Sequence, residues 1–176
     1  MKSNKGLSII NIVLLLAALA VAIWGLIGFE CPPGFKWALL ISIFALVCGF
    51  AYSCMGFSKS AAAFYMLFMA LLAIACVINA VAISKSGTNS LGMIMQIIVF
   101  VVVIALAVRD NTGKKASTIM MILMVAAQVV LLISTLAMGS SFGAQQLFTI
   151  DSLLLVLTAA SMVIAKYRDK TARGTN

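Results

Sequence analysis

Long runs of apolar residues, separated by short polar stretches, repeat along most of the chain. Six runs are long enough to cross a bilayer: residues 7–27, 37–57, 61–83, 91–108, 117–138 and 147–165. A helix that rises 1.5 Å per residue needs about 20 residues to span a hydrocarbon core about 30 Å thick. The runs lack the alternation of apolar and polar residues typical of membrane β-barrels. The pattern predicts an all-α polytopic membrane protein with six transmembrane helices, a single domain over residues 1–176 and a tail at 166–176.

The composition excludes an ordinary water-soluble domain. Hydrophobic residues make up 64% of the chain and charged residues 9%, whereas soluble domains carry about 25% charged residues. So few charges cannot cover a water-facing surface of this size. We therefore expect the outer surface to contact the lipid bilayer.

The basic residues predict an orientation in the membrane. The chain has 12 Lys and Arg against 4 Asp and Glu, and they lie between the apolar runs instead of forming the basic face that nucleic acid requires. If the N-terminus is cytoplasmic, only Lys36 and Lys85 lie on the opposite side. Basic residues concentrate on the cytoplasmic side of membrane proteins. We expect both termini to be cytoplasmic, in a plasma or inner membrane, and no nucleic-acid partner.

The first apolar run has two interpretations. The basic opening MKSNK and the small residues at 18–22 fit a secretory signal peptide with a cleavage site. The run continues to Phe29, which is longer than the usual apolar core of a signal peptide. Its length favours a retained first helix, with cleavage as the alternative.

A charged stretch, AVRDNTGKKAST, separates the fourth and fifth runs. It contains Arg109, Asp110, Lys114 and Lys115, and its RDNTGK spacing returns as RDKTAR after the sixth run. One interpretation is a set of three parallel helical-hairpin repeats. The other is that each cytoplasmic turn acquired basic and small residues independently. We interpret the stretch first as an orientation signal and second as a candidate gating loop.

Asp151 is the only acidic residue inside an apolar run, about one turn into the sixth run. A carboxylate there is expected to be stabilised by the unpaired N–H groups and positive dipole end of the helix. The alternative is a proton or cation site, because ionisable residues within a membrane often serve transport.

Neutral amides extend this candidate site. Asn79, Gln96 and Gln128 lie within three different runs. Amides in transmembrane helices form interhelical hydrogen bonds worth about 0.6–2 kcal/mol, and they can also bind a polar substrate. Small residues four positions apart, such as Ala18 with Ala22 and Ala45 with Gly49, predict close helix packing.

The inventory of reactive residues argues against an enzyme. The chain has no histidine, so its four cysteines lack a base that would activate them or complete a usual zinc site. It also lacks the Gly-x-Ser-x-Gly and phosphate-cradling glycine motifs. We predict no catalytic residues, no metal site and no cofactor.

Two resemblances to transport families were found. Residues 110–115, DNTGKK, resemble the D-(R/K)-x-G-(R/K)-(R/K) part of a cytoplasmic loop in major facilitator transporters, although Asn111 replaces a basic residue and Leu106 stands where that motif has glycine. The length, six runs and alanine-rich first run resemble the membrane subunits of energy-coupling-factor vitamin transporters. That second resemblance implies docking to a separate ATPase module through the alanine face of the first helix.

These observations favour a small transporter, or the membrane subunit of a transport system, with an unknown substrate. Partner membrane subunits are expected in the second case. The alternative is a non-transporting membrane scaffold or accessory subunit of a larger complex. Convergence of Asn79, Gln96, Gln128 and Asp151 on one place would favour transport, and their separation would favour the scaffold.

Overall fold

Six helices build the molecule. The computed structural model describes residues 3–30, 33–86, 90–112, 118–138 and 143–173, and no strand occurs among them. The helices are α1 (Ser3–Gly28), α2 (Pro33–Cys54), α3 (Ala62–Ser86), α4 (Ser90–Asn111), α5 (Thr118–Met138) and α6 (Ala144–Arg173), with a short 3-10 turn, η1 (Lys59–Ala61), before α3. The all-α prediction and the six helices are confirmed.

Five of the six helices extend beyond the predicted runs at one or both ends. Helix α2 begins at Pro33, well before residue 37, because proline fits the first turn of a helix, where its missing N–H would have had no partner. Helix α6 continues past Ala165 to Arg173. The predicted tail therefore begins as helix, and the first connection, at residues 29–32, is shorter than the apolar pattern indicated.

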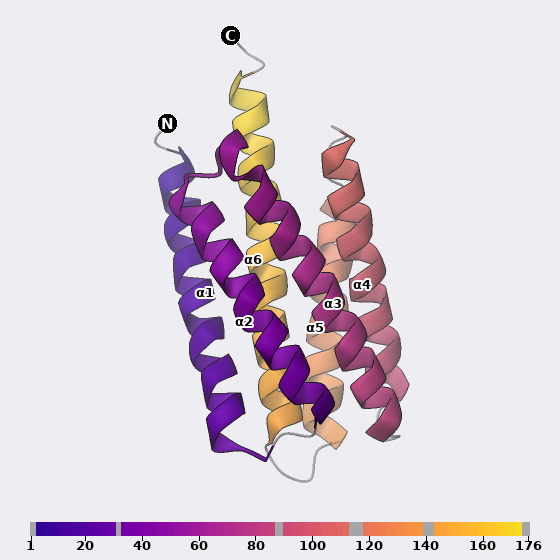
Figure 1. Cartoon of the computed structure of the whole chain (residues 1–176). Coiled ribbons are helices and arrows are strands. Elements are labelled where there is room, and N and C mark those ends of the chain that lie inside the picture. The colour runs from indigo at the N-terminus through magenta and orange to yellow at the C-terminus, as the bar shows by residue number, and fades with distance from the viewer. Residues whose placement is uncertain (1–2, 31–32, 87–89, 113–117, 139–142, 174–176) are drawn as a thin grey trace.

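The helices form a closed bundle in chain order. Each helix packs against the next one, α1 also packs against α6, and α2 crosses inward to contact α6. Figure 1 shows the helices running alternately up and down, with N and C at the same end. We call this end of the bundle the terminal end and the opposite end the distal end. Antiparallel neighbours are compatible with three hairpin repeats, which remain a prediction.

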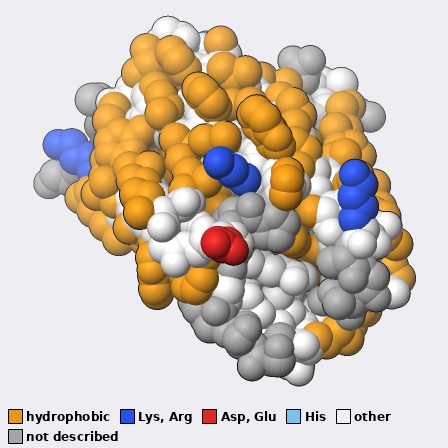
Figure 2. Space-filling view, turned by 60° about the horizontal axis from the view of Figure 1, so that its bottom comes forward, with side chains coloured by type: hydrophobic (Ala, Val, Ile, Leu, Met, Phe, Trp, Pro, Cys, Tyr) orange, Lys and Arg blue, Asp and Glu red, His pale blue; other side chains and the backbone are white. Residues whose placement is uncertain are grey.

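The outer surface is apolar. All six long helices are apolar enough to cross a membrane, and side chains such as Ile27 and Ile119 are about four-fifths exposed, at 81% and 77%. Figure 2 shows hydrophobic side chains over much of the side of the bundle, with separate basic and acidic groups toward the end turned forward. Such a surface is stable against lipid tails and unstable in water, which agrees with a multi-pass membrane protein.

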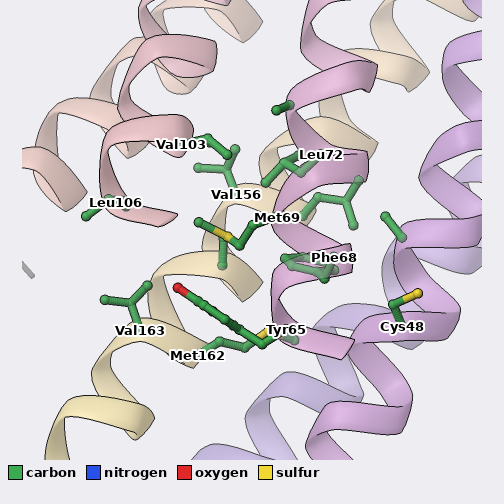
Figure 3. Close-up of a cluster of buried hydrophobic side chains, with 14 of the residues drawn as sticks. Cys48, Tyr65, Phe68, Met69, Leu72, Val103, Leu106, Val156, Met162 and Val163 are labelled. Atoms are coloured by element: carbon green, nitrogen blue, oxygen red, sulfur yellow. The ribbon is translucent and has the colours of Figure 1, made fainter. Parts of the chain in front are cut away.

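The larger part of the core lies toward the terminal end. Figure 3 shows Tyr65, Phe68, Met69 and Leu72 of α3 near Val156, Met162 and Val163 of α6, with Val103 and Leu106 contributed by α4. We call this group of buried side chains the terminal cluster. It joins residues from all six helices, so it fixes their relative positions.

Small residues let the helices approach closely, as predicted. Ala18, Ala22 and Ala45 are fully buried. At Gly49 an added Cβ would lie 3.0 Å from Leu15 of α1 and 3.2 Å from Phe68 of α3 and Met162 of α6. Because Ala18 and Ala22 are covered by the protein's own helices, they are not available to an ATPase module.

Substitution of Gly49 by leucine is expected to destabilise the bundle. Three helices surround this position without room for a larger side chain, and overpacking costs about 1–3 kcal/mol. Thermal unfolding in detergent would measure the loss for Gly49→Leu. Gly6→Leu serves as the control, because nothing lies within 4 Å of its Cβ position. Equal unfolding temperatures of the two variants would contradict the packing described here.

Candidate functional site

A second, smaller group of buried apolar side chains lies toward the distal end. It contains Ala22, Phe35, Ala38, Leu39, Ile83, Leu131 and Phe148. The rings of Phe35 from α2 and Phe148 from α6 have centroids 6.3 Å apart, within the range of favourable aromatic pairs. We call this group the distal cluster.

A polar residue separates the two clusters on each of four helices, α2, α3, α5 and α6, and on α4 Gln96 lies on the distal side of Val99 of the terminal cluster. On α3, for example, Cys76 belongs to the terminal cluster, Ile83 belongs to the distal cluster, and Asn79 lies between them on the buried face. On α5, Gln128 lies in the same way between Met124 and Leu131. The residues in this position are Ser42 of α2, Asn79 of α3, Gln96 of α4, Gln128 of α5 and Asp151 of α6. We call these five residues the polar layer.

Helix geometry places the five residues at a similar depth. Counted from the distal end of its own helix, each residue is six to ten positions away. At 1.5 Å per residue these positions correspond to depths of about 9–15 Å. On α1 the residues at this depth are Ala18 and Ala22, which are buried, small and apolar. The structure therefore brings Asn79, Gln96, Gln128 and Asp151 to one level of the bundle interior.

The polar layer is buried and poor in hydrogen bonds. The side chains of Asn79, Gln96, Gln128 and Asp151 are at most 1% exposed. Within the described segments their nitrogen and oxygen atoms form no hydrogen bond of normal geometry, although the Ser42 side chain lies beside the Asp151 carboxyl. A buried polar group left unpaired costs about 1–3 kcal/mol, and more if it is charged. This arrangement lowers the stability of the bundle, so a polar ligand that pairs with these groups would be bound favourably.

Ser42 differs from the other members. Its hydroxyl donates to the carbonyl of Leu39, at 2.8 Å, within its own helix. The side chain also lies beside the carboxyl of Asp151. Helix α2 therefore brings a hydroxyl next to the acidic group of α6, consistent with the packing of these two helices across the bundle.

The expected position of Asp151 at the start of its helix is wrong. Helix α6 begins at Ala144, so Asp151 lies two turns inside it, about 10 Å from the helix start. Only the first four N–H groups of a helix are unpaired, and Asp151 is beyond them. At the start of α6 it is Gln146 that pairs with a backbone N–H: its side-chain oxygen accepts a hydrogen bond from the Gly143 N–H, at 3.0 Å. Helix-terminal stabilisation does not account for the buried carboxyl.

No basic side chain within the described segments forms an ion pair with Asp151. A carboxylate removed from water is very costly unless a proton or a cation neutralises it. The polar layer supplies a carboxyl, three amides and one hydroxyl, which are all oxygen ligands or hydrogen-bond donors of moderate strength. These groups suit a proton, a small hard cation or an uncharged polar solute.

Other buried polar residues have simpler roles. Thr135 and Thr158 donate to carbonyls one turn earlier, at 2.7 and 2.8 Å, as hydroxyls inside membrane helices often do. Asn11 is fully buried but lies on α1 closer to the terminal end, away from the polar layer. Across the part of the chain that the structure describes, no three Cys, Asp or Glu side chains gather to hold a metal ion.

The charged stretch around Asp110 contributes a second arrangement, at the terminal end. Asp110 lies in the last turn of α4 and pairs with Lys166 of α6. The Lys166 ammonium also lies 4.4 Å from the ring centroid of Tyr65, a favourable cation–π distance. Tyr65 in turn packs against Tyr52 of α2, with ring centroids 5.4 Å apart. The ion pair and these rings connect four helices.

These contacts change the interpretation of the charged stretch. Arg109 and Asp110 belong to helix α4 instead of a loop. Lys114 and Lys115 lie outside the described residues, as does Cys31. The second RD motif, at residues 168–169, also lies in a helix, within the last two turns of α6.

Sequence reasoning missed Ser42 and Lys166. Ser42 falls within the three- and four-residue spacing of the buried face of α2, which includes Leu39, Ala45 and Gly49. That spacing could have identified it. The partnership of Lys166 with Asp110 joins residues 56 positions apart, and no local pattern marks such a pair.

Comparison with known proteins adds no family to this picture. No protein-family model, curated protein or solved structure matches the chain.

The pair between Asp110 and Lys166 is expected to stabilise the terminal end. Both side chains are less than a quarter exposed, at 13% and 21%, so solvent screens their attraction only in part. Asp110→Asn, Lys166→Gln and the double variant, unfolded in the same detergent, should reveal a coupling of about 0.5–3 kcal/mol.

The charge-swapped variant Asp110→Lys with Lys166→Asp provides the control. It should recover part of the stability that either single charge reversal removes. Additive losses across the cycle, with no recovery in the swapped protein, would show that the pair contributes nothing to the fold.

Proposed function

We propose that this protein is a small transporter, or the membrane subunit of a transport system, and that the polar layer binds its substrate or coupling ion. The observation that carries the proposal is the uncompensated carboxyl of Asp151, fully buried at a similar depth in the bundle to the amides of three other helices. Ionisable residues inside membrane bundles are costly, and they commonly mark ion or substrate pathways. A purely structural bundle would gain stability by replacing them with apolar residues.

The position of the layer also supports this proposal. The distal cluster lies on one side of it and the terminal cluster on the other. Transporters commonly bind their cargo near the middle of the membrane, between two barriers that open in turn. In this arrangement, the side chains of Phe35 and Phe148 form part of the distal barrier, while Tyr65 and Phe68 belong to the terminal barrier.

Asp151 has the most specific role in the proposal. Its carboxyl carries a proton or a small cation, and Gln128 and Asn79 supply amide oxygens or N–H groups to the cargo. Release to either side requires one apolar cluster to separate and admit water. The thinner distal cluster is the barrier that needs to break fewer contacts.

We also propose an orientation in the membrane from the positions of the basic residues. The terminal end, with Lys166 and Arg109, faces the cytoplasm of a plasma or inner membrane, because Lys and Arg are retained on that side. The distal end then faces outward.

Ion flux through proteoliposomes tests the proposal. Purified protein is reconstituted, a membrane potential is imposed, and the internal pH is followed with a trapped dye, with sodium and potassium gradients tested in parallel. Asp151→Asn keeps the size of the side chain but cannot hold a charge, so the flux should fall by about tenfold or more, the effect of about 1.4 kcal/mol on a rate.

Thr158→Val is the matched control. It removes a fully buried hydroxyl from the same helix, but one that bonds its own backbone, so flux should be retained. Unchanged flux in Asp151→Asn would reject the ion site.

The scaffold alternative makes a different prediction in the same experiment. Wild-type vesicles that pass no more ions than empty vesicles would favour it. Stoichiometric recovery with another membrane protein after gentle purification, without any ligand-dependent thermal shift, would support it further.

A further inference from the structure

Two apolar grooves flank the distal half of α3 on the outer surface. One groove, of about 490 Å³, lies between α3 and α4 and is bordered by residues that include Ala80, Met93 and Phe100. The other, of about 530 Å³, lies between α2 and α3 and is bordered by residues that include Gly34, Ile78 and Ala82. Both volumes fall in the range of small-molecule sites, about 300–1,000 Å³.

The grooves share one wall. Val77, Val81 and Lys85 border both of them, and these residues follow each other at four-residue steps along α3. Val77 and Val81 are exposed on the outer surface, at 42% and 48%. They therefore form a ridge with a groove on either side, and Lys85 stands at the distal end of this ridge, in the last turn of α3.

Two polar groups accompany the apolar walls. Lys85 places a positive charge at the end of the helix, where the hydrocarbon region gives way to lipid headgroups. Gln96 of α4 borders the groove between α3 and α4, is fully buried and has no hydrogen-bond partner among the residues that the structure describes. It lies six residues, or about 9 Å, inside α4 from the distal end. This depth is below the level of Lys85, toward the hydrocarbon.

We propose that one anionic phospholipid binds astride α3, with an acyl chain in each groove and its phosphate at Lys85. The two grooves then accept the two chains of a single lipid, and the lysine that they share supplies the charge that its phosphate requires. The Gln96 amide donates a hydrogen bond to an ester carbonyl, the polar group that a phospholipid carries just below its phosphate. Gln96 is also a member of the polar layer, but Lys85 and the two grooves carry this inference, which does not rest on the transport proposal.

The paired geometry favours a phospholipid over other occupants. A soluble anion would use Lys85 alone and leave both apolar grooves unfilled. A lipid with a zwitterionic headgroup would fill the grooves but gain less from the lysine, because its own cationic group offsets the phosphate charge. Only a two-chain anionic lipid uses all the features together.

Native mass spectrometry of the full chain, delipidated in detergent, tests this proposal. Phosphatidylglycerol and phosphatidylcholine with identical chains are added in equal amounts, and the bound fractions are compared. Wild-type protein should prefer phosphatidylglycerol by about fivefold, the ratio equivalent to about 1 kcal/mol for one lysine at a lipid surface. Lys85→Gln should abolish this preference.

Matched variants separate charge from groove. Lys36→Gln removes an exposed charge at the same end of the bundle but borders neither groove, so the preference should persist. Val81→Trp places a bulky side chain on the ridge, where it obstructs both grooves, and should lower the binding of both lipids. Val101→Trp, on an exposed face of α4 outside the grooves, should not lower it.

Two ligand controls complete the test. Lysophosphatidylglycerol, with one chain, should bind more weakly than phosphatidylglycerol, and free glycerol phosphate should not compete. Equal binding of phosphatidylglycerol and phosphatidylcholine, a preference retained in Lys85→Gln, equal binding of the one-chain lipid, or displacement by free glycerol phosphate would each overturn the proposal.

Discussion

The cost of placing polar groups where neither water nor a partner can satisfy them is the constraint on which this structure depends. The outer surface of the bundle is apolar and offers no polar partner, so polar side chains within the spans must turn inward. The five members of the polar layer, one on each helix from α2 to α6, are buried at a similar depth in the bundle. Packing alone would place apolar residues there, since two apolar clusters lie directly above and below. The proposed transport role offers a reason for the polar layer that stability does not.

The rest of the bundle compensates for this layer. The terminal cluster draws side chains from all six helices, and close contacts at Gly49 bring α1, α2, α3 and α6 together. At the terminal end, Lys166 pairs with Asp110 and lies over the ring of Tyr65. The distal end has less apolar packing, with only the smaller distal cluster beyond the polar layer. Stability is therefore unevenly divided, and the distal end requires the least energy to open.

Much of the fold could be predicted from the sequence because lipid imposes a simple rule on length and hydropathy. The six apolar runs gave six helices, and the small residues Ala18 and Ala45 were correctly expected at helix contacts. Helix ends were harder, since Pro33 can begin a helix as well as interrupt one. The apolar run predicts a helix start about one turn before Asp151. Residues 144–146 are also helical, so α6 begins about two turns before Asp151.

The candidate site was predictable in part for a similar reason. Buried acids and amides within apolar runs are rare enough to identify individually, so Asp151, Asn79, Gln96 and Gln128 could be named. Their common level depends on how far each helix extends, which composition does not determine. The ion pair of Asp110 with Lys166 depends on α4 and α6 approaching each other at one end, a consequence of the whole bundle.

Access of water to the polar layer is the most direct measure of the central claim. In a protein whose native cysteines are replaced by alanine or serine, Gln128→Cys is treated in intact membranes with a small, water-soluble thiol reagent. Met124→Cys and Leu131→Cys, on the same buried face of α5, are treated in parallel. The account predicts that position 128 reacts, because the layer opens to water during function, and that both apolar neighbours react much more slowly. Equal protection of all three positions would contradict a functional polar layer.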